Sequence, residues 1–262
     1  MTMLRQSADL AWRNMIRLRR SPASLTTSLV EPVLFACLLG FVFGGSLGGP
    51  AYREFVVAGL LMQTVTFSAT FTTMGLAHDL QDGAIDRLRT LPIARVSLLL
   101  ARTTSDLTAC LLSVSVSTAC GLVLGWRPRN GPLHVLGAYL MVVLFAFLMS
   151  WIGAFVALVT PNVQVAGSIG LLWLFPLTFV SSGFVSATSL PGPLATVATW
   201  NPVSGLANSL RVLFGNSAPP GFLAQHGWPA EHPVVYGTAS ALVLIAAFGA
   251  LSTWRYRRRT AT

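Results

Sequence analysis

The chain has no lysine. Its 17 basic residues are therefore all arginines, and with eight acidic residues they give a net charge of +9. The phosphate-binding loop of P-loop NTPases needs the lysine of its Gly-Lys-Ser/Thr motif to reach the β- and γ-phosphates. A loop of that type is excluded here, so any ATP that powers this protein through such a loop must be hydrolysed by another chain.

Charge is scarce as well. Only 10% of the residues are charged and 53% are hydrophobic, whereas soluble domains carry roughly 25% charged residues. The apolar residues form continuous runs, not the alternating segments of about 10 residues that build a membrane β-barrel. The composition predicts an all-α polytopic membrane protein.

Cysteine and histidine are few. Cys37, Cys110 and Cys120 lie inside apolar runs without a Cys-x-x-Cys pair, so we expect free thiols. The four histidines are not spaced as a metal motif. The sequence therefore predicts no catalytic, metal or cofactor site in this chain.

Each apolar run has about the 20 residues needed to cross 30 Å of hydrocarbon as a helix. The predicted spans are 24–43, 55–77, 97–124, 133–159, 163–184 and 234–254. Residues 1–23 precede them with an amphipathic pattern typical of a helix in the headgroup plane. Residues 185–233 are rich in proline, and we expect short external helices or a re-entrant hairpin there.

The arginines predict the orientation. With both termini in the cytoplasm, the inner side carries 13 arginines and the outer side only Arg53, Arg127, Arg129 and Arg211. Cytoplasmic loops are the ones enriched in basic residues. We therefore expect a plasma-membrane protein with both ends inside, whose arginines meet lipid headgroups and not nucleic acid.

A charged segment separates the second and third predicted spans. Residues 78–95 read HDLQDGAIDRLRTLPIAR and hold six of the 25 charged residues. Leu80, Ala84, Leu88 and Leu91 share one helical face, and Pro92 ends the pattern. This spacing predicts a short amphipathic helix at the cytoplasmic surface within 78–96.

Four motifs in order resemble the permease subunits of type-2 ABC exporters, in particular the daunorubicin-resistance branch. The first is Glu31-Pro32 with FGG at the end of that run, and the second is an acidic residue, a glycine and Arg-x-Arg-x-Leu-Pro in the charged segment. The third is LFPLTFVSSGFV at 174–185 and the fourth is LPGPLATVATWNPVSGLANSLR at 190–211. The likeness covers nearly the whole chain.

The resemblance implies that 78–96 is a coupling helix that docks on a separate ATPase subunit. The residues that it would use are Asp79, Asp82, Gly83, Asp86, Arg87, Arg89, Leu91 and Pro92. The wider family usually has Glu two positions before the glycine, where this chain has Gln81 followed by Asp82. Which acid contacts the ATPase therefore stays open. The resemblance also implies two ATPase copies that bind ATP and Mg, and a second permease copy or a related permease.

Polar residues inside the spans are the candidates for a transport pathway. The residues singled out are Glu31, Gln63, Thr66, Thr70, Ser113 and Ser117. Small and hydroxyl side chains in membrane helices also serve close helix packing, and Glu31 with Pro32 can equally be a structural kink. Asp106 lies one helical turn from Arg102, so we expect an ion pair at the cytoplasmic end of the third span.

The function that the resemblance implies is outward transport of amphipathic drug-like or lipid-like compounds by a non-enzymatic permease subunit. Export of a polysaccharide or a lipid-linked glycan is the first alternative, and it would use aromatic rings along a wide channel. A membrane-embedded enzyme would need paired catalytic groups near one membrane face. An ion-driven carrier would show inverted repeats, and we find no repeat of fixed period.

Overall fold

The protein is all-helical in the computed structural model, which describes residues 22–43, 49–82, 95–184, 190–216 and 227–259. These ranges contain helices and the turns that join them, so the all-α prediction is confirmed for them. The predicted interfacial helix at the N-terminus and residues 83–94 of the predicted coupling helix lie outside the described residues.

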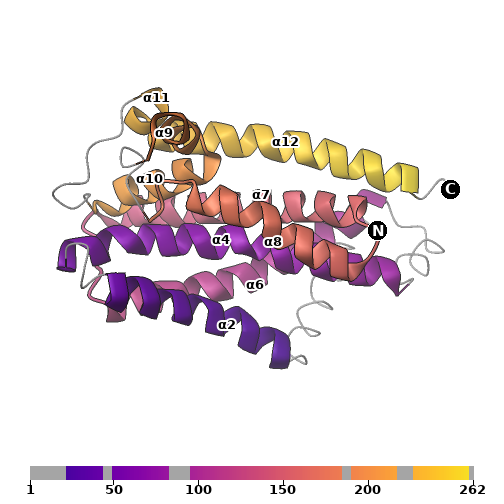
Figure 1. Cartoon of the computed structure of the whole chain (residues 1–262), viewed down its shortest axis with the longest axis horizontal. Helices are drawn as coiled ribbons and strands as arrows, with labels where there is room; N and C mark the ends of the chain where they lie inside the picture. Colours follow the sequence, from indigo (N-terminus) through magenta and orange to yellow (C-terminus); the bar gives the residue numbers. More distant parts are fainter. Residues whose placement is uncertain (1–21, 44–48, 83–94, 185–189, 217–226, 260–262) are drawn as a thin grey trace.

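The helices fall into a long set and a short set (Figure 1). The long set is α2 (Pro22–Cys37) with η1 (Leu38–Phe43), α4 (Gly49–Gln81), α6 (Arg95–Val123), α7 (Pro132–Val159), α8 (Val163–Phe179) and α12 (Pro233–Arg259). The short set is α9 (Gly192–Thr199), α10 (Pro202–Phe214) and α11 (Trp228–Glu231). The long helices run along the long axis of the molecule, and the short ones gather at one end.

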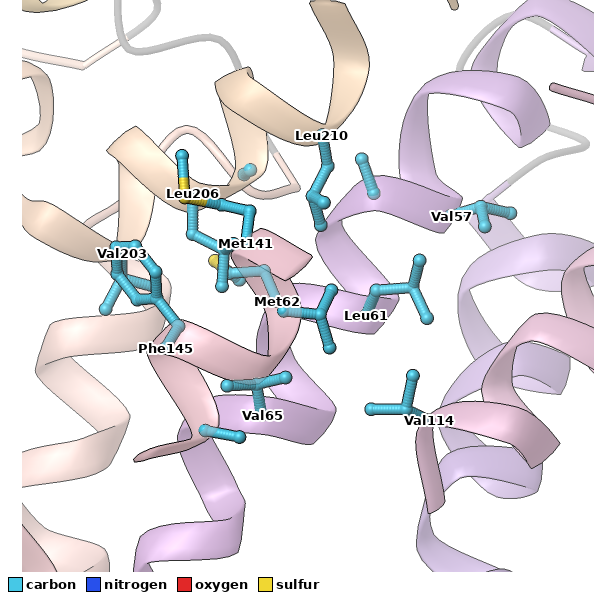
Figure 2. Packing of buried hydrophobic residues seen from close by; sticks show 14 of the residues in the cluster. Val57, Leu61, Met62, Val65, Val114, Met141, Phe145, Val203, Leu206 and Leu210 are labelled. Atoms are coloured by element: carbon cyan, nitrogen blue, oxygen red, sulfur yellow. The ribbon is translucent and has the colours of Figure 1, made fainter. Parts of the chain in front are cut away.

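Helix α4 is the centre of the bundle. Its 33 residues make a rod about 50 Å long, which packs against α2, α6, α7, α8 and α10. A helix that is apolar on all sides is expected to be buried on all sides. Figure 2 shows the result, with Val57, Leu61 and Val65 of α4 meeting side chains of α6, α7 and α10 in one core.

Local sequence explains where several helices begin and end. Asn162 accepts a hydrogen bond from the backbone of Val165 at the start of α8, at 2.8 Å, and Asn201 caps α10 in the same way. Gly215 ends α10 with a φ of 74°, a left-handed conformation that costs glycine little. Pro32 stands inside α2, which continues as the wider π-helix η1.

Within the described ranges, four helices are long and apolar enough to cross a membrane. Their spanning parts are Ala51–Gln81, Arg102–Val123, Pro132–Val159 and Pro233–Tyr256. Two shorter apolar helical stretches, Val30–Phe41 and Val163–Phe179, accompany them. Each of the six predicted spans overlaps one of these elements.

One departure from the predicted ranges is at the end of α8. We expected a span to residue 184, but the helix ends at Phe179. The backbone beyond it bonds to α10 instead of continuing the helical ladder: the Ser182 N–H donates to Ser204 Oγ at 2.9 Å. Asn201 Nδ2 donates to the carbonyls of Leu177 and Val180, both at 2.7 Å. These side chains replace helical bonds, so the chain can turn here without losing its partners.

Candidate functional site

An arginine joins the two helices that flank the charged segment. Arg102, near the start of α6, donates from Nη1 to Asp79 Oδ2 of α4 at 2.7 Å and from Nε to Asp106 Oδ2 at 3.1 Å. The pair with Asp106 was predicted from sequence and is confirmed. The pair with Asp79 was missed, because it joins residues 23 positions apart on different helices. We call Arg102, Asp79 and Asp106 the inner clamp.

A glycine makes room for this clamp. A Cβ placed on Gly75 of α4 would lie 1.7 Å from Nη2 of Arg102. The guanidinium therefore rests directly on the α4 backbone, and a side chain at position 75 would displace it. Sequence analysis did not single out Gly75, since a glycine inside a helix gives no sign of what packs against it.

Two of the predicted coupling residues are described, and they differ in surroundings. The Asp79 side chain is 23% exposed and belongs to the inner clamp, whereas the Asp82 side chain is 48% exposed and lies 2.8 Å from His78 Nδ1. Gly83, Asp86, Arg87, Arg89, Leu91 and Pro92 lie outside the described residues. Of the two described acids, Asp82 is the one more open to a partner protein.

The predicted pathway residues separate into several environments. Glu31 and Ser113 line a narrow cavity between α2, α4 and α6, together with Ser68, Cys110 and Asp106. The structure thus brings the carboxylates of Glu31 and Asp106 to one cavity, which sequence spacing could not show.

The hydroxyl groups of the other candidates are used within the bundle. Thr66 and Thr70 donate to carbonyls of α4 itself, those of Met62 at 2.8 Å and Phe67 at 2.6 Å. Ser117 of α6 bonds to Thr64 of α4, with 2.8 Å between the hydroxyl oxygens. Of these contacts, only the one between Ser117 and Thr64 joins two helices, in the way small polar residues do in membrane bundles.

Gln63 is different. Its side chain is 2% exposed, and within the described part of the chain neither its Oε1 nor its Nε2 has a hydrogen-bond partner. Leaving a buried polar group unsatisfied costs about 1–3 kcal/mol. An amide that destabilises the fold and makes no hydrogen bond within the described residues is a candidate for binding another molecule.

Its neighbours one turn away show where Gln63 lies. A Cβ on Gly59 would be 2.2 Å from the Gly183 carbonyl, just beyond α8. Phe67 has its ring centroid 6.4 Å from Phe35 of α2 and 5.6 Å from Phe175 of α8. Residues four apart share a helical face, so Gln63 faces the space between α2 and α8. We call this place, with Gln63 and its phenylalanines, the α2–α8 seam.

At the opposite end of the bundle, a second arginine holds the turn after α8. Arg211 of α10 is buried and donates to the carbonyls of Ser182 at 2.8 Å and Gly183 at 2.7 Å. Its guanidinium carbon lies 3.6 Å from the centroid of the Phe55 ring, a favourable cation–π arrangement. We call these contacts the outer clamp; sequence analysis placed Arg211 on the outer side but gave it no such role.

Known proteins match the chain over most of its length. Residues 5–214 match the model of the family described as ABC-2 type transporter. The chain belongs to this family. It is 28% identical over 252 residues to the daunorubicin resistance ABC transporter permease protein DrrB1 of Streptomyces coeruleorubidus, a match that covers 95% of this chain and 85% of that protein.

Other relatives are more distant. The probable doxorubicin resistance ABC transporter permease protein DrrC of Mycobacterium tuberculosis is 27% identical, covering 76% of this chain and 73% of its own. The putative transport permease ycf38 of Porphyra purpurea is 24% identical, covering 79% of this chain and 73% of its own.

The resemblance seen in the sequence is thereby confirmed. The ABC-2 protein described here is a multi-pass membrane protein and a permease subunit, related to permeases of drug resistance. In this family the ATPase is a separate protein that binds the nucleotide. This agrees with a chain that has no lysine for a phosphate-binding loop.

Proposed function

We propose that this permease moves amphipathic drug-like or lipid-like compounds outward across a bacterial plasma membrane. Six helices would span the bilayer, with α8 and the α2–η1 pair as its two shorter spans. Both termini would lie in the cytoplasm, and α9–α11 would form the external segment. The names of the drug-resistance relatives favour this substrate class over a glycan.

The observation that supports the substrate class is the α2–α8 seam. An amphipathic aromatic compound needs apolar, ring-shaped contacts and a few placed polar groups. The seam has the ring of Phe67, which packs against Phe35 and Phe175, one helical turn from Gln63, whose amide finds no hydrogen-bond partner among the described residues. Phe179 stacks on Phe175 with ring centroids 5.8 Å apart and extends the aromatic surface toward the outer end.

A second copy, or a related permease, would complete the pathway. The seam sits beside helices whose outward faces are apolar and uncovered, with Leu34 and Phe41 exposed on α2–η1 and Leu172 on α8. A partner placed against these faces would enclose the seam between two protomers. The substrate would then reach it from the inner leaflet.

Energy would arrive through residues 78–96. Two ATPase copies with ATP and Mg would receive this segment, one for each permease, at the end of the bundle where α4 ends and α6 begins. The inner clamp supports this, because Arg102 ties these two helices together. A displacement of the segment would therefore move α4 and α6 as one unit.

Gln63→Leu tests the substrate site. Leucine has a similar size and removes an unsatisfied amide, so the melting temperature should be unchanged or higher, while drug export from cells should fall about tenfold, as expected when one hydrogen bond of about 1.4 kcal/mol is lost. Drug accumulation in cells that also express the ATPase is the measurement. Thr66→Val is the matched control, since that hydroxyl is bonded within α4. Export by Gln63→Leu at the rate of the unmodified protein would refute the site.

A further inference from the structure

A groove runs between α7 and α12 on the side of the bundle away from α2. It has a volume of about 480 Å³, within the range of about 300–1,000 Å³ typical of small-molecule sites. Phe147 and Trp151 line it from α7, and Gly249, Ala250 and Trp254 line it from α12. Neither the transport pathway nor the clamps described above use these residues.

Small residues on α12 create the groove, and a tryptophan forms its floor. A Cβ added to Gly249 would meet the Trp151 ring first, at 4.0 Å. The ring of Phe147 stands edge-on to Trp151, with centroids 6.1 Å apart. The groove is therefore a rigid aromatic and aliphatic surface, of the kind that contacts an acyl chain.

The rim of the groove is basic. Arg258 is exposed near the end of α12, and its guanidinium carbon lies 4.3 Å from the centroid of the Trp254 ring, which lines the groove. Ala246 and Arg258 are 12 positions apart in the sequence, about 18 Å along a helix. The groove thus passes from an apolar floor to a cationic rim, with a tryptophan at the level where membranes meet water.

We infer that this groove binds an anionic phospholipid. The acyl chain lies along Trp151 and Gly249, and the phosphate meets Arg258 beside Trp254. A zwitterionic lipid would fill the floor equally well but would gain less at the rim, and a second copy of this basic helix end would be repelled. The inference rests on α12 spanning the membrane and not on the substrate exported.

Native mass spectrometry of the detergent-purified permease tests the groove, with phosphatidylglycerol and phosphatidylcholine of identical chains as probes. The unmodified protein should retain phosphatidylglycerol preferentially. An arginine at a membrane surface strengthens binding of anionic lipid about fivefold, so Arg258→Gln should weaken retention of phosphatidylglycerol about fivefold. Gly249→Leu fills the floor without changing charge and should reduce retention of both lipids.

Matched controls separate the groove from general effects. Ala247→Leu adds the same bulk to an exposed position of α12 that does not line the groove, and Arg53→Gln removes a charge at the start of α4. Both should bind lipid like the unmodified protein. Equal retention of the two lipids, full retention by Gly249→Leu, or equally tight binding of soluble glycerol phosphate would each overturn the inference. So would a dimer that Gly249→Leu dissociates while the lipid stays bound.

Discussion

Arg102 joins α4 and α6 at one end of the bundle. It holds Asp79 of α4 and Asp106 of its own helix at the same time. Removing one of these three charged residues would leave an unpaired charge in a partly buried place. The free-energy cost of that charge is larger than the stabilisation that the intact ion pair contributes. Only half of the clamp was predictable, because helical spacing reveals Arg102 with Asp106, whereas Asp79 and Gly75 meet Arg102 through tertiary packing alone.

Gly75→Ala should destabilise the protein. The added methyl group would lie 1.7 Å from Nη2 of Arg102, so the guanidinium must move and its bonds to both aspartates must weaken. Overpacking of this kind costs about 1–3 kcal/mol, which a thermal melt of the purified permease would report as a lower melting temperature. Gly167→Ala is the control, since its new atom would make only ordinary contacts, the nearest at 3.8 Å. Equal melting temperatures of the two variants would show that the clamp tolerates displacement.

At the scale of elements, long apolar runs in the sequence predicted where the helices lie, but they did not predict where a helix is interrupted. The runs at 133–159 and 234–254 appear within α7 and α12. The end of α8 at Phe179 could not be read from apolar residues that continue to 184, because it depends on Asn201, Ser204 and Arg211 of α10, which lie far along the chain. The three short helices between 185 and 233 agree with the proline-rich sequence.

The coupling segment yields a prediction at this scale. Asp82→Arg combined with Asp86→Arg should uncouple transport, because reversed charge on the proposed coupling segment would repel the ATPase that is proposed to receive it, while the inner clamp at Asp79 stays intact. In liposomes reconstituted with the ATPase, drug-stimulated ATP hydrolysis and drug transport should both fall at least tenfold. A tenfold loss corresponds to about 1.4 kcal/mol. This is less than the binding free energy usually lost when one partner of a buried interfacial charge pair is removed.

Glu231→Arg makes the same kind of change at an exposed acid of α11, at the other end of the molecule. It should leave both activities unchanged. Unaltered transport by the double variant would mean that these acids do not contact the ATPase. Residues 83–94 would then need another role.

At the scale of the whole molecule, the positions of the turns and helix ends at the two ends of the bundle correspond to the proposed topology. The turn at 160–162 and the ends of α4 and α12 lie at one end of the bundle, and the turn at 124–131 lies at the other with α9–α11 (Figure 1). Sequence alone predicted this alternation from the arginines. It could not predict that α4 would be the central helix, because all of its apolar positions look equally suited to lipid and to protein.

Single cysteines in a variant lacking Cys37, Cys110 and Cys120 would test the topology. A membrane-impermeant maleimide should label Gly131→Cys and Gly192→Cys in intact cells. It should label Pro161→Cys only after permeabilisation, because that position lies at the proposed cytoplasmic end. All three positions are exposed. The opposite labelling pattern would reverse the orientation and, with it, the side from which the ATPase binds.

The outer clamp has a consequence for the environment that the protein can tolerate. Arg211 is held by the carbonyl oxygens of Ser182 and Gly183 and by the face of Phe55, and none of these groups takes up a proton when the medium turns acidic. Arg102 at the other end is held by the carboxylates of Asp79 and Asp106. In the proposed topology, the end of the bundle that faces outward would therefore keep the contacts of Arg211 when the surroundings acidify.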